Sequence, residues 1–302
     1  MARTKILRFN KICLAYNLQR EKSVTLSDQF EVALNDLQVK VMKLPLGLLE
    51  PFCLEEQEIK SIDLVIVFGG DGTLLTAARK FSSFGIPLLG INTGNLGFLS
   101  EANIPANITA FLQEILNGRF RTDSRSMIEG TIFKKKTEAS NEDESDNSLV
   151  ALNDIVISRS SRSHILKINL EVDGAEIAQY MADGVIICTP TGSTAYSLAA
   201  GGAVLDPSIQ GLGVIPICAH SLTSRPLIIA DSSTLKISTT PRNRRQSLIT
   251  VQADGQETFL LEPEDTVIIK KSNISTLLIR SLNPENSFYT VLSRKLLWGR
   301  SS

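Results

Sequence analysis

The segment Gly69-Gly70-Asp71-Gly72-Thr73 places a carboxylate among glycines, directly after an apolar run. Glycines allow a ligand to approach the backbone closely, and the first amides of a helix attract phosphate. A carboxylate beside phosphate opposes that attraction, so Asp71 needs a task of its own. In phosphoryl transfer an acidic residue orients a hydroxyl nucleophile and accepts its proton, or helps to hold a metal ion. The alternative is a tight turn between a strand and a helix, in which Asp71 only caps the helix.

A second segment rich in Asn and Gly follows the next predicted strand and reads Asn92-Thr93-Gly94-Asn95-Leu96-Gly97-Phe98-Leu99. The carboxyl ends of parallel strands collect ligands at one edge of a sheet. This segment could therefore shape the same site as Asp71. A plain loop before the next helix is the alternative.

Two polar residues, Asn153 and Asp154, interrupt an otherwise apolar strand predicted over residues 149–158. Neighbouring side chains of a strand point to opposite faces, so at least one of them would enter the interior and need a partner there. A ribose diol could be that partner for Asp154, while Asn153 could bind the edge of a base. An edge strand or bulge with both side chains in water is the alternative.

The longest unusual stretch leads from an apolar strand beginning near Asp183 into Thr189-Pro190-Thr191-Gly192-Ser193-Thr194-Ala195-Tyr196-Ser197 and then a helix rich in Ala and Gly. Ser193 and Thr194 could cap that helix while their neighbours bind hydroxyls or phosphate. The ring of Tyr196 could lie against a flat base. Capping alone is the alternative.

Further along, Ala219-His220-Ser221-Leu222-Thr223-Ser224-Arg225-Pro226 could contact phosphate through His220 and Arg225, or form a structural corner. These segments are far from Asp71 in the sequence. If they face it in the fold, the ligand site is a cleft between domains, where small molecules commonly bind.

The elements around Asp71 alternate between strand and helix, which predicts a small open α/β sheet in residues 1–124. Residues 63–68 are almost continuously apolar, as in a strand buried on both faces of a parallel sheet. Strands are also expected over residues 11–17 and 86–91. Helices are expected at three places: around Phe30, Leu34, Leu37 and Val41, from Thr73 to about Phe81, and around Phe111 up to Gly118.

After residue 125 the pattern changes to short strands with little helix, so residues 125–281 are expected to form a mostly antiparallel β domain. Asp173-Gly174 and Asp254-Gly255 suit tight hairpin turns. Residues 137–148 are acidic and almost without apolar side chains, which favours a solvated hairpin insertion. Residues 282–302 are expected to dock back on the first domain as a tail.

Composition narrows the class of protein. A chain of 302 residues with 43% apolar and 21% charged residues is typical of a globular protein with two domains. Lys and Arg (31) balance Asp and Glu (32), so no surplus charge attracts nucleic acid or anionic lipid. We find no membrane-spanning run, secretory signal, zinc spacing, disulfide framework, Walker loop or clean Gly-x-Gly-x-x-Gly motif, and expect a cytoplasmic protein.

Taken together, the motifs resemble those of the NAD kinase family, the ATP-dependent enzymes that phosphorylate NAD to NADP. The resemblance runs from residue 63 to 225, with weaker support up to residue 298. The matching segments, in chain order, are residues 69–73, 92–99, 153–154, 183–202 and 220–226. The resemblance implies an α/β amino-terminal domain and a β-rich carboxyl-terminal domain, with NAD between them.

The resemblance also implies a role for each matching residue. Asp71 would act on the 2′-hydroxyl of the adenosine ribose, helping that oxygen to attack the γ-phosphate of ATP, and Gly72 would allow close approach. A divalent cation, expected to be magnesium, would neutralise the triphosphate. The dinucleotide would be bound by Asn153, Asp154, Asp183, Thr194, Ala195, Tyr196, Ser197, Leu198, Ala199 and Gln256.

The family also suggests self-association, as a homodimer or homotetramer. One departure from its pattern is Met181, which stands where many relatives have a basic residue two places before the aspartate matching Asp183. A phosphate contact at that point, and a preference between NAD and NADH, are therefore not implied. Two other functions stay open: a lipid or sphingoid-base kinase, and a dinucleotide sensor without catalysis.

Overall fold

The computed structural model divides the chain into two compact units. The first unit comprises residues 1–124 and 275–302, and the second comprises residues 125–274. The structure describes residues 9–47, 54–94, 97–100, 104–135, 145–159, 165–221, 223–241, 248–282 and 287–297. Two long strands, β5 (Arg121–Phe133) and β16 (Thr266–Arg280), contribute residues to both units.

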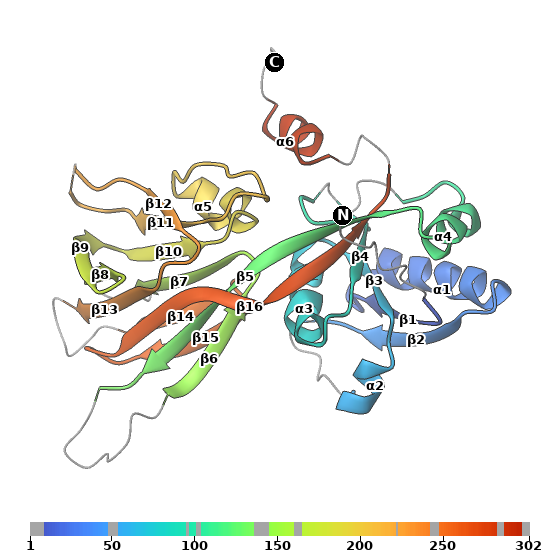
Figure 1. Ribbon diagram of the computed structural model, residues 1–302, viewed down its shortest axis with the longest axis horizontal. Helices are drawn as coiled ribbons and strands as arrows, with labels where there is room; N and C mark the ends of the chain where they lie inside the picture. Colours follow the sequence, from blue (N-terminus) through green and yellow to red (C-terminus); the bar gives the residue numbers. More distant parts are fainter. Residues whose placement is uncertain are drawn as a thin grey trace. The chain divides into compact units, whose positions relative to one another are not determined.

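The first unit contains a parallel sheet in the order β2-β1-β3-β4-β16, in which β16 pairs with β4 through Leu278 and Leu88 (Figure 1). Every residue of β3 and β4 is buried, because helices cover both faces of the sheet. The prediction of an α/β amino-terminal domain is confirmed. The other strands of this parallel sheet are β1 (Lys11–Tyr16), β2 (Lys40–Pro45), β3 (Leu64–Gly69) and β4 (Leu88–Asn92).

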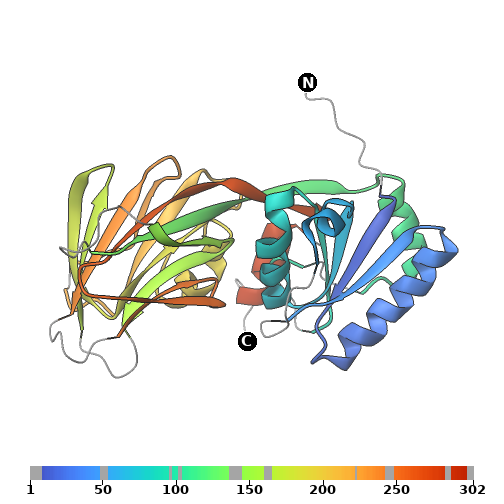
Figure 2. The same ribbon diagram turned by 90° about the horizontal axis from the view of Figure 1, so that it is seen from below.

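Helices α1 and α4 cover one face of this sheet and α3 lies on the other, as Figure 2 shows. The ring of Phe30 in α1 packs 4.9 Å from the ring of Phe68 in β3 and 6.4 Å from the ring of Phe111 in α4. The helices are α1 (Glu21–Asp36), α2 (Glu56–Lys60), α3 (Asp71–Phe81), the 3₁₀ helix η1 (Ser82–Phe84), α4 (Ile108–Leu116) and α6 (Phe288–Leu296). None of the helices in these described stretches is long and apolar enough to cross a membrane.

The prediction that the helix around Phe30 includes Val41 was wrong, because Val41 lies in β2. The helix ends at Asp36, and Gln38 then takes a left-handed conformation with φ 59°. The N–H of Val39 donates to the carbonyl of Leu34 at 3.0 Å, which closes the helix end. Helical spacing of apolar residues continued by chance into the next strand.

The second unit has a six-stranded antiparallel sheet in the order β12-β11-β10-β7-β14-β15, and a second set in which β16, β13, β8 and β9 pair in turn. Side chains of both sets form one core, as in a sandwich of sheets. The prediction of a mostly antiparallel β domain is confirmed. Its remaining elements are β6 (Ser145–Ala151), β7 (Asp154–Arg159), β8 (Leu166–Val172), β9 (Ala175–Ala182), β10 (Gly184–Cys188), η2 (Gly192–Thr194), α5 (Tyr196–Ala199), β11 (Gly211–Ile217), β12 (Leu227–Ala230), β13 (Leu235–Pro241), β14 (Ile249–Ala253) and β15 (Glu257–Leu261).

Two hairpins turn at the predicted Asp-Gly pairs. Asp173 and Gly174, between β8 and β9, have φ 50° and 84°. Asp254 and Gly255, between β14 and β15, have φ 51° and 64°. Positive φ at two successive positions is the mark of the tight hairpin turn that follows the twist of the strands, so both predictions are confirmed.

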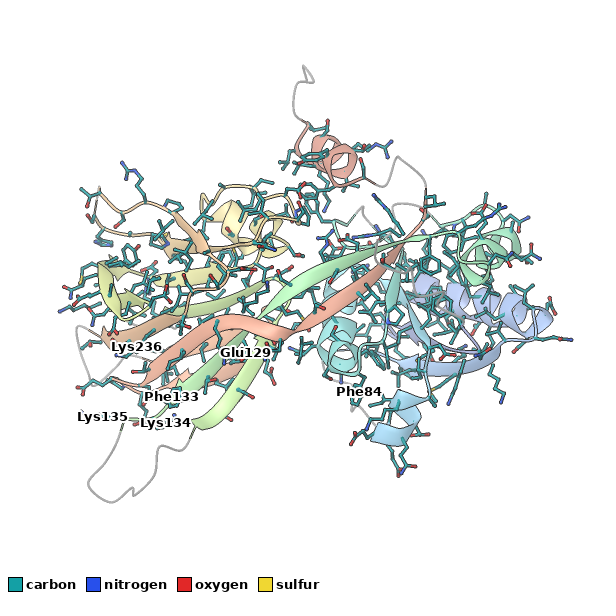
Figure 3. All side chains as sticks on the ribbon, in the orientation of Figure 1. Phe84, Glu129, Phe133, Lys134, Lys135 and Lys236 are labelled. Carbon is teal, nitrogen blue, oxygen red and sulfur yellow. The ribbon has the colours of Figure 1, made fainter. Side chains whose placement is uncertain are left out.

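Lysines on the strands of the second unit face carboxylates of neighbouring strands. Lys236 on β13 pairs with Glu171 on β8 at 2.9 Å, and Glu129 on β5 pairs with Lys270 on β16 at 3.1 Å. Figure 3 labels Lys236 and Glu129 on their strands. Opposite charges in cross-strand pairs contribute to sheet stability, so these lysines do not form an unpaired basic surface.

The acidic insertion was predicted over residues 137–148. Residues 137–144 lie outside the described residues, and residues 145–148 form the first part of β6.

Candidate active site

Asp71 is the first residue of α3, directly after β3 and Gly70. The N–H of Phe98 donates to Oδ2 of Asp71 at 2.8 Å, and the N–H of Leu99 donates to Oδ1 at 3.2 Å. Among the described residues, the hydrogen-bond donors to Asp71 are these two amides of a distant segment and not amides of α3, so the alternative in which Asp71 only caps its helix is wrong. The half-buried carboxylate instead holds the segment that follows β4.

Glycines decide how closely this segment approaches the carboxylate. A Cβ added at Gly97 would lie 2.0 Å from Oδ1 of Asp71, so any other residue there would collide with the side chain. A Cβ added at Gly69 would lie 2.3 Å from Oγ1 of Thr73, so that glycine lets α3 turn tightly off β3. Gly70 and Gly72 differ, because a Cβ on either would meet no atom within 4 Å. Packing against the part of the chain that the structure describes therefore gives no reason for glycine at these two positions.

The peptide groups that face Asp71 are also held from their carbonyl side. Nη1 of Arg280 donates to the carbonyl of Leu99 at 2.6 Å, and Nη2 donates to the carbonyl of Phe98 at 3.4 Å. Arg280 is only 6% exposed, and its Nε lies 3.6 Å from Oδ2 of Asp123. Sequence reasoning missed Arg280, and the available signal was a charged residue ending the apolar run at residues 277–279.

The ring of Phe98 lies against α6. Its centroid is 6.4 Å from that of Phe288, and Nζ of Lys295 lies 4.3 Å above its face. These contacts are apolar and cation–π in kind, and they add to the hydrogen bonds from Arg280. The loop bound by Asp71 is thus fixed by residues from the end of the chain, all within the first unit.

In the second unit, the strand predicted over residues 149–158 is interrupted. β6 ends at Ala151 and β7 begins at Asp154, so Asn153 lies in a break and not inside a strand. The prediction of one continuous strand was wrong, because the carboxylate of Asp254 replaces strand pairing at this point. Oδ2 of Asp254 accepts from the N–H of Leu152 at 3.0 Å, and Oδ1 accepts from Asn153 at 2.7 Å and from Asp154 at 3.2 Å.

Asp154 is 4% exposed, so of the two alternatives for this pair the inward one is correct for its side chain. Burial, together with the smaller effect of the nearby charge of Asp254, raises the pKa of Asp154 from 3.8 to about 7. The carboxyl is therefore protonated in a large share of molecules at neutral pH. The side chain of Asn153 is half-buried.

The hydroxyl-rich segment packs against residues 152–153. Oγ1 of Thr189 donates to the carbonyl of Leu152 at 2.6 Å and accepts from the N–H of Gly192 at 3.1 Å. Ser193 and Thr194 do not cap a helix, which corrects that expectation. Their hydroxyls donate to carbonyls three residues back, and the helices η2 and α5 are one turn each and have no side-chain cap.

The remaining predicted residues are not all brought to this segment. The register of β7 and β10 pairs Asp154 with Cys188 and places Asp183 beside Arg159, at the opposite end of the two strands. Tyr196 is 47% exposed, so its ring is accessible for a contact. Asp183 forms a two-point ion pair with Arg159, at 2.6 Å from Nε to Oδ1 and 3.2 Å from Nη2 to Oδ2, and this hydrogen bonding raises the pKa of Arg159. The N–H of Gln256 donates to the carbonyl of Ala253 at 2.9 Å.

Other expectations have simpler outcomes. His220 and Arg225 are exposed, and the N–H of His220 donates to the carbonyl of Met181 at 2.8 Å. Cys13 and Cys188 are free and buried, and burial raises their pKa values to about 12 and about 11, so they are poor nucleophiles. Cys53 lies outside the described residues. Within the stretches that the structure describes, no three His, Cys, Asp or Glu side chains are grouped to hold a metal ion.

Comparison with protein families and solved structures gives one answer. The family model for the ATP-NAD kinase N-terminal domain matches residues 20–120, and the model for the ATP-NAD kinase C-terminal domain matches residues 152–281. The chain is 40% identical to the NAD kinase of Carboxydothermus hydrogenoformans over 241 residues, 80% of this chain and 81% of that one. It is 41% identical to NAD kinase 1 of Prochlorococcus marinus over 243 residues, 79% of this chain and 78% of that one.

Two solved structures share the fold. The crystal structure of yeast NADH kinase complexed with NADH has a TM-score of 0.81 and 23% identity, covering 98% of this chain and 89% of that one. An NAD kinase from Archaeoglobus fulgidus in complex with ATP has a TM-score of 0.71 and 24% identity, covering 94% of this chain and 99% of that one. Fold and sequence together define a kinase with a nucleotide acceptor.

The chain belongs to the NAD kinase family, as the resemblance of its motifs predicted. It is a phosphotransferase, and its activity is the ATP-dependent phosphorylation of NAD.

Proposed function

We propose that Asp71 is the catalytic base that directs phosphorylation to the 2′-hydroxyl of the adenosine ribose of NAD. The ribose oxygen forms a bond to the γ-phosphorus of ATP, the bond from that phosphorus to the β-phosphate oxygen breaks, and the products are NADP and ADP. The hydroxyl proton passes to the carboxylate and then to solvent. The observation that supports this role is a half-buried carboxylate at the start of α3, fixed by two backbone amides.

The geometry around Asp71 leaves capacity for a substrate. Each carboxylate oxygen accepts one of the two amides, and an ionised carboxylate oxygen has lone pairs for two hydrogen bonds. Each oxygen therefore keeps one position for a hydroxyl or a cation. Gly70 and Gly72 have open space where a side chain would stand, which suits the close approach of a phosphate or a ribose.

The second unit supplies the proposed dinucleotide site. Asn153 projects from a backbone that is tied on both sides, and Asp154 offers a carboxyl that can donate or accept near neutral pH. The exposed ring of Tyr196 suits stacking against a base. The other residues proposed to contact the dinucleotide are Asp183, Thr194, Ala195, Ser197, Leu198, Ala199 and Gln256.

Magnesium fits this arrangement as a companion of the triphosphate. Mg²⁺ in kinases is usually bound by one or two carboxylates together with phosphate oxygens and water, so a dedicated cage of protein ligands is not required. Asp71 is the carboxylate proposed to face the ion. When bound, the ion neutralises charge on the triphosphate.

We also propose that the protein is a homodimer or homotetramer in the cytoplasm. Light scattering can test the number of subunits, and cell fractionation can test the location.

The variant Asp71→Asn tests the proposed base. The amide cannot accept the hydroxyl proton, so kcat is expected to fall at least about a hundredfold. The dissociation constant for NAD is expected to change less than about threefold, because most of the proposed binding contacts come from residues other than Asp71. NADP formation in a coupled assay and NAD binding by calorimetry measure the two quantities. A variant that keeps its turnover removes Asp71 from the mechanism.

The wild-type chain separates the alternatives. Tight NAD binding without NADP formation would identify a dinucleotide sensor, and phosphorylation of a sphingoid base or diacylglycerol would identify a lipid kinase. Neither result is expected of a member of this family.

A further inference from the structure

We propose that Asp254, a hairpin-turn residue, is a positioning residue for the dinucleotide site, because its carboxylate fixes the backbone that presents Asn153 and Asp154. This inference rests on the proposed function, in which these two side chains bind NAD. Asp254 touches neither substrate in this proposal. It acts on the site only through residues 152–154.

Three successive amides converge on this one carboxylate. The distances from the nitrogens of Leu152, Asn153 and Asp154 to its oxygens are 3.0, 2.7 and 3.2 Å. A carboxylate that accepts several backbone N–H groups is held firmly and holds them in turn, since these charge-assisted bonds are about twice as strong as neutral ones. The backbone N–H of Asp254 also donates to the carbonyl of Asp154, at 2.9 Å.

The other two carbonyls of the segment have partners as well. Thr189 donates to Leu152 through Oγ1 at 2.6 Å and to Asn153 through its N–H at 2.9 Å. All six backbone polar groups of residues 152–154 are therefore satisfied, although Leu152 and Asn153 lie between two strands. A break between strands would otherwise leave these groups without a partner, which is costly in the interior. Asp254 supplies half of the six bonds from its side chain.

Steric contact limits the segment from the side of the hydroxyl-rich loop. A Cβ added at Gly192 would lie 2.0 Å from the carbonyl oxygen of Asn153, so the two backbones are already in contact. The segment cannot move further in that direction. Loss of the carboxylate would free it to move on the opposite side only, which would turn Asn153 away from its position.

The chain contains a matched turn for comparison. Asp173 begins the other Asp-Gly hairpin turn, with φ 50° against 51° for Asp254. Oδ1 of Asp173 accepts one N–H, from Thr234 at 2.8 Å, at an exposed site. The turn conformation alone therefore does not explain the three amides gathered by Asp254. Substitutions by Asn or Gly keep both turns, because these residues adopt positive φ readily.

The experiment compares Asp254→Asn and Asp254→Gly with Asp173→Asn and Asp173→Gly in the full chain. Asp254→Gly removes every acceptor oxygen, so the KM for NAD is expected to rise at least about tenfold, with a smaller rise for Asp254→Asn. The KM for ATP and the kcat at saturating NAD are expected to change less than about threefold. Both Asp173 variants are expected to keep wild-type kinetics.

A purely structural role would give a different result. In that case the Asp254 variants would unfold at lower temperature while their KM for NAD stayed at the wild-type value, and the proposal would be overturned. If Asp254→Gly does not fold, Asp254→Asn decides alone, because it keeps an oxygen for two of the amides. A wild-type KM in folded Asp254→Asn would then refute the positioning role.

Asn153→Ala separates this inference from the proposed function. A raised KM for NAD in Asn153→Ala, together with unchanged values in the Asp254 variants, would overturn only the positioning role. An unchanged KM in Asn153→Ala would overturn the assignment of NAD binding to this segment, and the inference with it.

Discussion

Asp71 in the first unit and Asp254 in the second are built alike. Each carboxylate lies at the end of a strand and accepts successive backbone amides from a segment distant in the sequence. They differ in how fully their oxygens are used. Oδ1 of Asp254 accepts two amides, whereas each oxygen of Asp71 accepts one. The comparison teaches that a carboxylate that holds a loop can also react only if it keeps a free lone pair.

The glycines that face the two anchors differ in a related way. Gly97 faces a side chain, the carboxylate of Asp71, while Gly192 faces backbone, the carbonyl of Asn153. Adding a methyl group at each position should therefore damage different properties. A methyl group at Gly97 should lower turnover more than stability, and one at Gly192 should lower stability more than turnover.

The largest effect is expected for Gly97→Ala. The new Cβ would occupy a point 2.0 Å from Oδ1 of Asp71, so the carboxylate must rotate or the loop must retreat. A displacement of about 1 Å at a reacting group can lower the rate about a hundredfold, and a loss of kcat of that order is expected. Steady-state NADP formation measures it. Gly94→Ala is the control for stability, since among the described residues its Cβ would meet the flexible end of Arg20, at 3.0 Å.

Gly192→Ala should be the more destabilising change. Its Cβ would overlap three backbone atoms of Asn153, at 2.0, 2.5 and 2.8 Å, and none of them can move alone. Overpacking of this kind costs about 1–3 kcal/mol of unfolding free energy, which urea denaturation can measure. Gly211→Ala in β11 is the control, because its nearest neighbour would be 3.2 Å away. Equal stability of the two variants would show that residues 152–154 are not rigid.

The last prediction concerns stability alone, which should depend on pH through a buried carboxyl of the second unit. The pKa of Asp154 is raised in the folded protein from 3.8 to about 7. Between these pH values the folded state keeps a proton that the unfolded chain has lost, so the free energy of unfolding falls as pH rises from about 4 to about 7. Asp154→Asn should lose this slope. Denaturation of both proteins at pH 5 and pH 8 tests the prediction, and parallel pH profiles would contradict it.

Sequence patterns predicted features that depend on neighbouring residues. The apolar run at residues 63–68 predicted β3, and two Asp-Gly pairs predicted two hairpin turns, because local conformation decides both. The family motifs predicted Asp71, and the fold places it at the start of α3 as expected for such a loop. Whether the predicted binding residues contact NAD stays a prediction.

Features that depend on distant partners were missed. The break at Asn153 exists because Asp254, far along the chain, replaces a strand partner, and no local pattern encodes that bond. Arg280 escaped notice for the same reason, since its meaning comes from the carbonyls of Phe98 and Leu99. Thr194 was predicted to cap a helix because hydroxyl side chains commonly do so. Its hydroxyl instead donates to the carbonyl of Thr191.

The placement of residues 275–302 in the first unit has a consequence for how the protein is made. Arg280, which donates hydrogen bonds to the carbonyls of Phe98 and Leu99, is translated only after the whole second unit. A nascent chain on the ribosome can begin to assemble its amino-terminal sheet early, but it lacks both the last strand and this guanidinium. The proposed base is therefore set in its final surroundings only after the second unit has been synthesised.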